Sequence, residues 1–379
     1  MREVGILGIG QVQVAERWET SLRELAYYSI KEALADAQVP GVDALYVGNM
    51  LAGELSGQEH LGALISDYAG FNGIEAVRVE AAAASGGAAL RQGFLSVASG
   101  MHDVVVVTGV EQMTDVLPEK VEFGLSLALD SEFELASGIS PTALFALLTR
   151  RYMHDYAYSP EDLAAFPVNA HRNSVGNEYA MYQGEIRIES VVQSPMVADP
   201  IHALECPPVC DGSASVILGC LEEGDDRCVK ISGSAMATDT IGLDNREDPL
   251  ELMAVKKSTD KAYEMASKAS EDIDFFEVHD LFPIVAALSL EAAGFAPKGE
   301  GALLARNDEI RLEGTIPITT MGGCKARGNP VGACGVYQAV EAVRQLRGEA
   351  GKNQLDATVG MIQCIGGTAA TAVTHILEV

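Results

Sequence analysis

Apolar and polar positions follow two periods along this chain, and together they predict an α/β fold. Short, almost uninterrupted apolar runs at Val4–Ile9, Ala44–Gly48 and Asp103–Thr108 have the character of buried strands. Ser21–Gln38 instead gathers its apolar residues on one side of a helix, because they recur every three or four positions. Strands that alternate with helices in this way are typical of an α/β protein.

The pattern occurs twice along the chain. Val42–Asn49 has the pattern of Ile273–Asp280, and each follows a helix that carries Lys, Ala and Glu. Farther along, Ser85–Gly100 has a counterpart in Val331–Gly348, and each ends in a glycine before another strand. We therefore predict two copies of one β/α unit, with the functional site where the strand ends of the two copies meet.

The chain between the copies breaks this pattern. Leu117–Gln193 contains a predicted helix at Pro141–Tyr156, and a second helix begins at Ser159 in a near capping-box sequence. Asp211–Ser215 is rich in turn residues and is predicted to be a tight turn into a strand at Val216–Leu218. These features divide the chain into an N-terminal half (1–116 plus 194–245), an inserted loop domain (117–193) and a C-terminal half (246–379).

The stretch Val79–Phe94 carries the first chemical signal. Every residue from Ala81 to Ala88 is small, which lets a helix begin deep in the protein with its first turn against other backbone. The first turn of a helix offers unpaired N–H groups and the positive end of the dipole, where an anionic nucleophile is best stabilised. The pattern resembles the thiolase superfamily, whose members place a nucleophilic cysteine before Ala-Ser-Gly-Gly. Ala83 stands at that position here, so the nucleophile is absent, and Ser85 is turned roughly 200° away around the helix.

A histidine motif in the second half extends the resemblance. His279–Phe282 (HDLF) lies between a predicted strand at Phe275–Val278 and a predicted helix at Pro283–Ala293. A lone buried histidine is usually structural. The motif nevertheless resembles the sterol-carrier and archaeal branches of the thiolases, in which this histidine helps to hold the thioester oxygen. The resemblance implies that role for His279.

Two glycine-rich blocks complete the resemblance. Gly322–Gly335 resembles the Gly-His-Pro-x-Gly-Ala block of thiolases, but Asn329 stands where the family has its catalytic histidine, and an amide cannot act as a base near neutral pH. Cys364–Gly367 (CIGG) resembles the motif in which a second cysteine moves the proton of the substrate α-carbon and glycine N–H groups form an oxyanion hole. This implies those roles for Cys364 and Gly366. The alternatives are a structural glycine-rich turn and a small buried cysteine.

The resemblance spans nearly the whole chain and implies a fold and a ligand. The implied fold is the duplicated thiolase fold, with two α/β halves in α-β-α-β-α layers and an inserted loop domain. Coenzyme A and acyl-CoA are then substrates, and no cofactor is bound permanently. In thiolases the insertion carries part of the coenzyme A site, so its basic residues are candidates for that contact, and the alternative is that they are solvated helix faces. These candidates are Arg150, Arg151, His171 and Arg172.

Three accounts of the activity stay open. The nearest activity is acetyl-CoA C-acetyltransferase, the formation or thiolysis of acetoacetyl-CoA, which we predict to be impaired because neither Ala83 nor Asn329 can form or activate an acyl carrier. An engineered alanine at position 83 of a working thiolase would explain only one of the two changes. A lyase or aldolase that acts without an acyl-enzyme, through His279, Cys364 or Tyr337, is the second account. A non-catalytic scaffold subunit of a mevalonate-pathway complex is the third.

Composition and resemblance together narrow the partners and the location. The net charge of −28 argues against nucleic acid and anionic membranes as partners. Seven cysteines, an odd number without a signal peptide, predict reduced thiols and a cytoplasmic protein, and no apolar run of about eighteen residues predicts a membrane span. The resemblance implies a homodimer or tetramer, with a hydroxymethylglutaryl-CoA synthase and a small zinc-ribbon/OB-fold protein as further partners.

Two other motifs do not support a site. Gly5–Gly10 lacks the G-x-G-x-x-G spacing and is followed by no helix start, so no dinucleotide site is predicted. Cys206 and Cys210 form one close pair, but no second pair of cysteine or histidine follows at ligand spacing, so no metal site is predicted.

Overall fold

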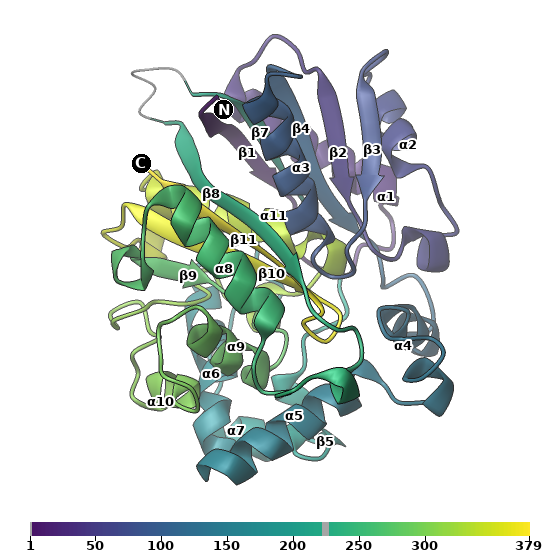
Figure 1. Cartoon of the computed structure of the whole chain (residues 1–379). Helices are drawn as coiled ribbons and strands as arrows, with labels where there is room; N and C mark the ends of the chain where they lie inside the picture. The colour runs from purple at the N-terminus through teal and green to yellow at the C-terminus, as the bar shows by residue number, and fades with distance from the viewer. Residues whose placement is uncertain (1, 222–226) are drawn as a thin grey trace.

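The computed structural model describes residues 2–221 and 227–379, and its centre is a nine-stranded sheet (Figure 1). The strands follow the order β3-β2-β4-β7-β1-β8-β11-β10-β9. The first five are β3 (Glu75–Val79), β2 (Ala44–Gly48), β4 (Val104–Glu111), β7 (Gly212–Cys220) and β1 (Val4–Gln11). The other four are β8 (Val229–Thr238), β11 (Thr371–Glu378), β10 (Val359–Gly366) and β9 (Phe275–Glu277). A separate two-stranded ribbon pairs β5 (Met196–Ala198) with β6 (Ile201–His202).

The predicted duplication is visible in how the strands pair. β2 runs parallel to β4, and β9 runs parallel to β10. In each copy two antiparallel pairings follow, β4 with β7 and β7 with β1 in the first, and β10 with β11 and β11 with β8 in the second. This order places β8 in the second copy, so the topology divides the copies between Cys220 and Val229, earlier than the boundary at 245 that the sequence analysis drew.

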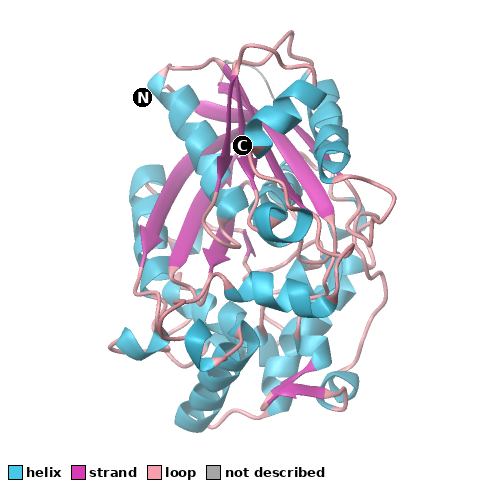
Figure 2. Cartoon of the chain, turned by 90° about the vertical axis from the view of Figure 1, so that its right-hand side faces the viewer, coloured by secondary structure: helices cyan, strands magenta, loops and turns pink. Residues whose placement is uncertain are grey.

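Helices form three layers around these strands (Figure 2). α1 (Leu22–Ala37) and α2 (Leu61–Tyr68) cover the outer face of the first copy in one apolar core. α3 (Ser85–Ser99) and α11 (Cys334–Leu346) lie between the two copies, in a core to which strands of both contribute. α8 (Met253–Ala266) and α9 (Pro283–Ala292) cover the outer face of the second copy. The predicted α-β-α-β-α layering is therefore confirmed.

The apolar run of β4 follows from its place between two helical layers. Val105 and Val107 face the central core with α3 and α11, whereas Val106 and Val110 face the core with α1. A strand that is buried on both faces needs apolar residues at successive positions, so its sequence shows no alternation.

The inserted segment packs mainly under the second copy. It contains α4 (Pro118–Ser126), α5 (Pro141–Tyr156), α6 (Pro160–Ser174) and α7 (Ile188–Val192). α5 and α6 share an apolar core with α9 and with α10 (Gly301–Arg306). The predicted helix at Pro141–Tyr156 has the observed bounds of α5, and the Ser159 N–H donates to Asp162 Oδ2 at 2.8 Å in the predicted capping box.

The prediction of a turn at Asp211–Ser215 is wrong, because β7 already begins at Gly212. The small polar residues there serve packing inside the protein. The hydroxyls of Ser213 and Ser215 each lie 2.7 Å from the Ser29 hydroxyl of α1, in hydrogen bonds that a larger side chain would exclude. A composition that is typical of turns therefore marks a close helix–strand contact in this protein.

The central helices contact each other backbone to backbone. A Cβ added at Gly335 of α11 would lie 2.3 Å from the Gly87 nitrogen of α3, and one added at Gly86 would lie 2.9 Å from the Gly332 oxygen. Only glycine permits this approach. It explains why the residues that open α3 are so small, and it places the start of α3 next to the glycine-rich block of the second copy.

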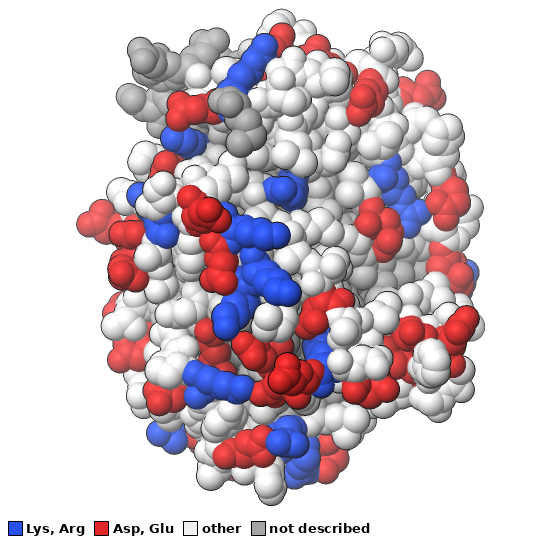
Figure 3. Space-filling model, in the orientation of Figure 1, with Lys and Arg blue, Asp and Glu red and all other residues white. Residues whose placement is uncertain are grey.

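The surface reflects the acidic composition of the chain. In Figure 3, Lys and Arg side chains gather over α8, which carries Lys256, Lys257 and Lys261, and acidic side chains surround them. Among the described residues, no helix is both long enough and apolar enough to cross a membrane.

Candidate functional site

The predicted nucleophile position lies in a tight turn before α3. Ala82 has a left-handed backbone with φ 51°, which is unfavourable for a residue with a Cβ. The Ser85 hydroxyl holds this turn, because it accepts from the Ala81 N–H at 2.9 Å and donates to the Ala82 carbonyl at 2.6 Å. Ser85 is thus fully buried and committed to the turn, whereas the methyl group of Ala83 faces a cavity. Ser85 therefore cannot replace a nucleophile at position 83.

Gly366 ends β10 directly against this turn. A Cβ at position 366 would lie 2.3 Å from the Ala81 carbonyl oxygen, so only glycine lets the strand approach so closely. The cysteine two residues earlier is brought into contact as a result. The Cys364 thiol donates to the Ala83 carbonyl oxygen across 3.1 Å.

His279 follows β9 and meets the same cysteine. Its Nδ1 lies 3.5 Å from Cys364 Sγ and accepts a hydrogen bond from the Ile365 N–H at 3.2 Å. Because Nδ1 accepts, the proton of the neutral ring belongs on Nε2. Burial, and next the positive charges of Arg327 and Lys325, lower the pKa of His279 to about 3, so the ring is neutral near pH 7. Within the described residues, Nε2 is a buried donor without a partner.

Asn329 enters the site from the glycine-rich block. Gly328 before it has φ 108°, and a Cβ there would lie 2.5 Å from Val14 Cγ1. Buried Arg327 anchors the same loop, since its Nη1 lies 3.3 Å from Glu341 Oε2 and its Nη2 donates to Cys334 Sγ at 3.1 Å. These contacts hold the Asn329 side chain against the cavity that also contains the methyl group of Ala83.

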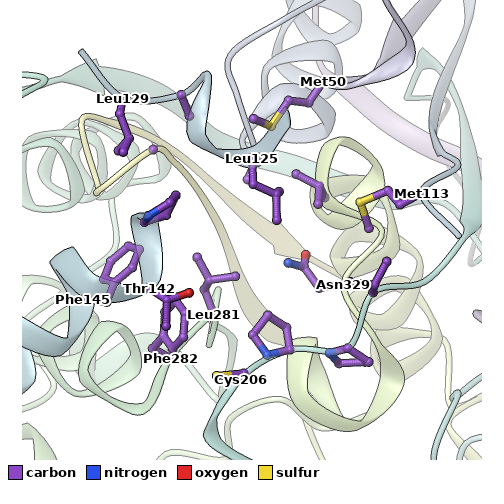
Figure 4. A pocket seen from close by; sticks show the side chains of 18 residues that line it. Met50, Met113, Leu125, Leu129, Thr142, Phe145, Cys206, Leu281, Phe282 and Asn329 are labelled. Carbon is purple, nitrogen blue, oxygen red and sulfur yellow. The ribbon is translucent and has the colours of Figure 1, made fainter. Parts of the chain in front are cut away.

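The cavity joins the two copies and the inserted segment (Figure 4). It has a volume of about 160 Å³. Leu281 and Phe282 line it from the segment between β9 and α9, and Phe145 lines it from α5. Three of the lining side chains carry a polar atom, namely Thr142, Cys206 and Asn329, and the others are apolar. Such a shape suits the apolar part of a ligand, with a few polar groups to orient it.

A buried carboxylate that the sequence analysis did not single out shapes this cavity. Glu111, at the end of β4, accepts hydrogen bonds from the backbone N–H groups of Met50, Leu51 and Gly332 at 2.9–3.0 Å. It ties the loop after β2 to the glycine-rich block, and Met50 and Val331 beside these contacts line the cavity. Burial raises the pKa of Glu111 to about 7, although these hydrogen bonds act to lower it. The signal in the sequence was an acidic residue that directly ends an apolar strand.

The four basic candidates lie away from the cavity lining. Arg150 pairs with Asp199, and Arg151 pairs with Asp155 in the last turns of α5. The His171 ring is buried with Nδ1 3.1 Å from the Gly184 oxygen, and Arg172 lies 3.8 Å from Glu313. None of the four lines the cavity, and their contact with coenzyme A stays a prediction.

One cluster contains residue types that bind metals, but its histidine has no free lone pair to offer a metal. Ligand atoms of His279, Cys324 and Cys334 lie within 4.8 Å of one another. A histidine binds a metal through a nitrogen that carries no proton. In His279 the lone pair of Nδ1 is taken by the Ile365 N–H, and Nε2 holds the proton. The geometry therefore does not favour a metal there.

Comparisons with known proteins agree with this arrangement. Residues 8–220 match the family described as "Thiolase, N-terminal domain", and residues 235–379 match "Thiolase C-terminal domain-like". The chain is 43% identical to an acetyl-CoA acetyltransferase of Methanothermobacter thermautotrophicus, with all of both chains covered. It is 29% identical to human sterol carrier protein 2, over 99% of this chain and 72% of that protein.

Solved structures share the fold. The structure described as "Ltp2-ChsH2(DUF35) aldolase" superposes with a TM-score of 0.86 at 22% identity, over 99% of this chain and 97% of that one. An acetyl-CoA acetyltransferase from Syntrophomonas wolfei superposes with a TM-score of 0.75 at 16% identity, over 100% and 99%.

Proposed function

This chain belongs to the thiolase family, and on that premise we propose that it binds an acyl thioester of coenzyme A but forms no acyl-enzyme. The observation that carries the proposal is that Ala83 and Asn329 line one cavity. By the family resemblance, these are the positions of the nucleophile and of its base. A methyl group cannot be acylated, and an amide cannot remove a proton near neutral pH.

Two cysteines near this position do not replace the missing thiolate. Cys206 lines the cavity, but burial raises the pKa of its thiol. Burial also raises the pKa of Cys364, whose thiol already donates to the Ala83 carbonyl. Acyl transfer needs the thiolate, so neither thiol is activated for attack.

The side chains that would polarise a bound thioester by the family resemblance, His279 and Cys364, are both present in this chain. His279 is neutral and has a free Nε2–H, which suits the thioester oxygen that the resemblance assigns to it. Cys364 is in contact with His279. This combination favours acetyl-CoA C-acetyltransferase as the nearest activity, impaired here, and a lyase or aldolase without acyl-enzyme as the second candidate. Tyr337 is a poor candidate for the lyase, because its buried hydroxyl donates to the Val12 oxygen at 2.6 Å.

The wider assignments follow the same resemblance. We propose a cytoplasmic homodimer or tetramer, with a hydroxymethylglutaryl-CoA synthase and a zinc-ribbon/OB-fold protein as further partners. β3 supports self-association, because it ends the sheet and leaves one edge free within the described residues, with Val77 42% exposed.

The test is to measure binding and turnover on the same protein. Calorimetric titration with acetyl-CoA should show saturable binding, and Ala128→Phe, which fills the cavity, should abolish it. Thiolysis of acetoacetyl-CoA should not exceed the rate in buffer. Robust thiolysis by the unmodified chain would contradict the loss of acyl-enzyme chemistry. Absence of binding would contradict the assignment of the ligand.

A further inference from the structure

The Asn329 amide is unusual because both of its ends are unpaired in a nearly apolar cavity. Asn329 is 4% exposed, and its Oδ1 is buried without a hydrogen-bond partner among the described residues. Nδ2 is not enclosed in the same way as Oδ1, and it makes no hydrogen bond within the described residues. In Figure 4 the amide projects toward the cavity that Leu125, Met113 and Leu281 surround.

The loop fixes this amide in place. Pro330 follows it, and Gly328 precedes it with φ 108°, a backbone angle that favours glycine. The buried Cys210 thiol packs against this loop, since a Cβ added at Gly328 would lie 3.2 Å from its Sγ. The side chain is 4% exposed, so its oxygen lies in the cavity and not in solvent. A ligand that supplies the missing partners recovers the free energy that an unpaired buried acceptor costs.

An amide with both ends free selects a group that donates and accepts at once. A hydroxyl does both, since it can donate to Oδ1 and accept from Nδ2. A ketone oxygen only accepts and leaves Oδ1 unpaired, and a saturated chain leaves both ends unpaired. Because the amide has both a donor and an acceptor, the conclusion does not depend on which end is oxygen.

We propose that Asn329 makes the cavity selective for acyl thioesters that carry a hydroxyl group close to the thioester, of the 3-hydroxyacyl-CoA class. This inference rests on the proposed function, because the position of Ala83 places the thioester end of the ligand in this cavity. For this substrate class an amide at position 329 recognises the hydroxyl better than a histidine does. The hydrogen-bonding groups of a histidine change when it binds a proton, whereas an amide offers one donor and one acceptor at any pH near neutral.

The experiment compares three ligands on the unmodified protein by equilibrium titration: 3-hydroxybutyryl-CoA, acetoacetyl-CoA and butyryl-CoA. We expect 3-hydroxybutyryl-CoA to bind roughly tenfold more tightly than either of the others, which is the usual effect of an unpaired buried polar group. Equal affinity for the three would overturn this inference and leave the proposed function intact. Failure of all three to bind would overturn both.

Two variants separate recognition from packing. Asn329→Leu keeps the volume of the side chain but removes both hydrogen-bonding groups, so the preference for the hydroxyl should vanish while butyryl-CoA still binds. Asn307→Leu is the matched control, because it makes the same change at an exposed side chain that does not line the cavity. A preference that survives Asn329→Leu, or that disappears in Asn307→Leu, would refute the role of Asn329.

Discussion

At the scale of single residues, the identities of Ala83 and Asn329 are the reason to expect binding of an acyl thioester without formation of an acyl-enzyme. Ala83 and Asn329 line one cavity. His279 and Cys364 contact each other, and Cys364 also contacts the Ala83 carbonyl, but neither side chain is part of the cavity lining. Each of these four residues was identified from its motif, because the identity of a reactive side chain can be read without knowing the fold. Which hydrogen-bonding groups are free could not be read, because that depends on partners such as Ile365 and Val12 far along the chain.

The first prediction concerns restoration of the missing pair. Ala83→Cys with Asn329→His should gain thiolysis of acetoacetyl-CoA, because a thiol at position 83 needs a base to become a thiolate. The double variant should exceed either single variant by roughly 100-fold, the usual effect of a general base. The measurement is the steady-state rate of acetoacetyl-CoA loss with coenzyme A.

A matched control keeps the number of thiols constant. Ser85→Cys with Asn329→His places the sulfur in the buried turn, where the Ser85 hydroxyl bonds to Ala81 and Ala82, and should gain nothing. If Ala83→Cys alone were as active as the double variant, Asn329 would not be the reason for the lost chemistry.

At the scale of elements, the contact between α3 and α11 positions the site. Glycines of each helix meet backbone to backbone, and this contact sets the start of α3 beside the loop that carries Asn329. The small residues of α3 were recognised in the sequence. Their partner helix was recognised only as its repeat counterpart, because the packing of two segments that are more than 200 residues apart depends on the whole fold.

The second prediction tests this contact. Gly335→Ala should destabilise the protein by about 2 kcal/mol, because its Cβ would lie 2.3 Å from the Gly87 nitrogen and backbone must move. Gly41→Ala is the control, since its Cβ would meet nothing within 4 Å, and it should change the stability by less than about 0.5 kcal/mol. Urea unfolding followed by circular dichroism measures both. Equal midpoints for the two variants would show that the helices separate at little cost.

At the scale of the whole molecule, the two copies are held together by buried polar groups as well as by the shared sheet. His375 of β11 has its Nε2 3.1 Å from the Gly87 oxygen of α3, and its Nδ1 is buried without a partner in the described residues. Burial lowers the pKa of His375 to about 4. The ring is therefore neutral in the folded protein at pH values where an unfolded histidine is already charged.

The third prediction is the resulting pH dependence. As the pH falls below about 6.5, the unfolded chain binds a proton at His375 and the folded chain does not. The stability therefore falls until the pH reaches the pKa of His375 in the folded protein. His375→Gln keeps a donor for the Gly87 oxygen but cannot titrate. Between pH 7 and pH 4 the unmodified protein should lose about 3 kcal/mol more than this variant.

The prediction compares the unmodified protein with His375→Gln because other buried groups also titrate in this pH range. Buried Glu111 and Glu341 have raised pKa values of about 7, and their contribution to the stability changes with pH in the opposite direction. Their effect cancels between the two proteins. His154→Gln, at a side chain that is 84% exposed, is the control for mutation alone. Parallel stability curves for the unmodified protein and His375→Gln would show that the pKa of His375 is not lowered in the folded protein.

The sequence alone determined the features that depend on residue identity and local order. These are the repeated β/α unit, the layered α/β fold, the small residues at the start of α3, and the absence of a nucleophile at Ala83 and of a base at Asn329. Hydrophobic period and side-chain chemistry are local properties, so they survive in the linear chain. The turn predicted at Asp211–Ser215 was wrong because glycine and serine serve turns and close packing alike.

Only the tertiary structure decided which of these residues meet and which of their atoms stay unpaired. It brought Ala83 and Asn329 to one cavity, clamped the cavity walls with Glu111, and placed none of the four basic candidates in the cavity lining. It also left the Asn329 amide and His279 Nε2 without partners in the part of the chain that it describes. Pairing of buried polar groups depends on elements that are far apart in sequence, and the burial that makes an unpaired group costly exists only in the folded protein.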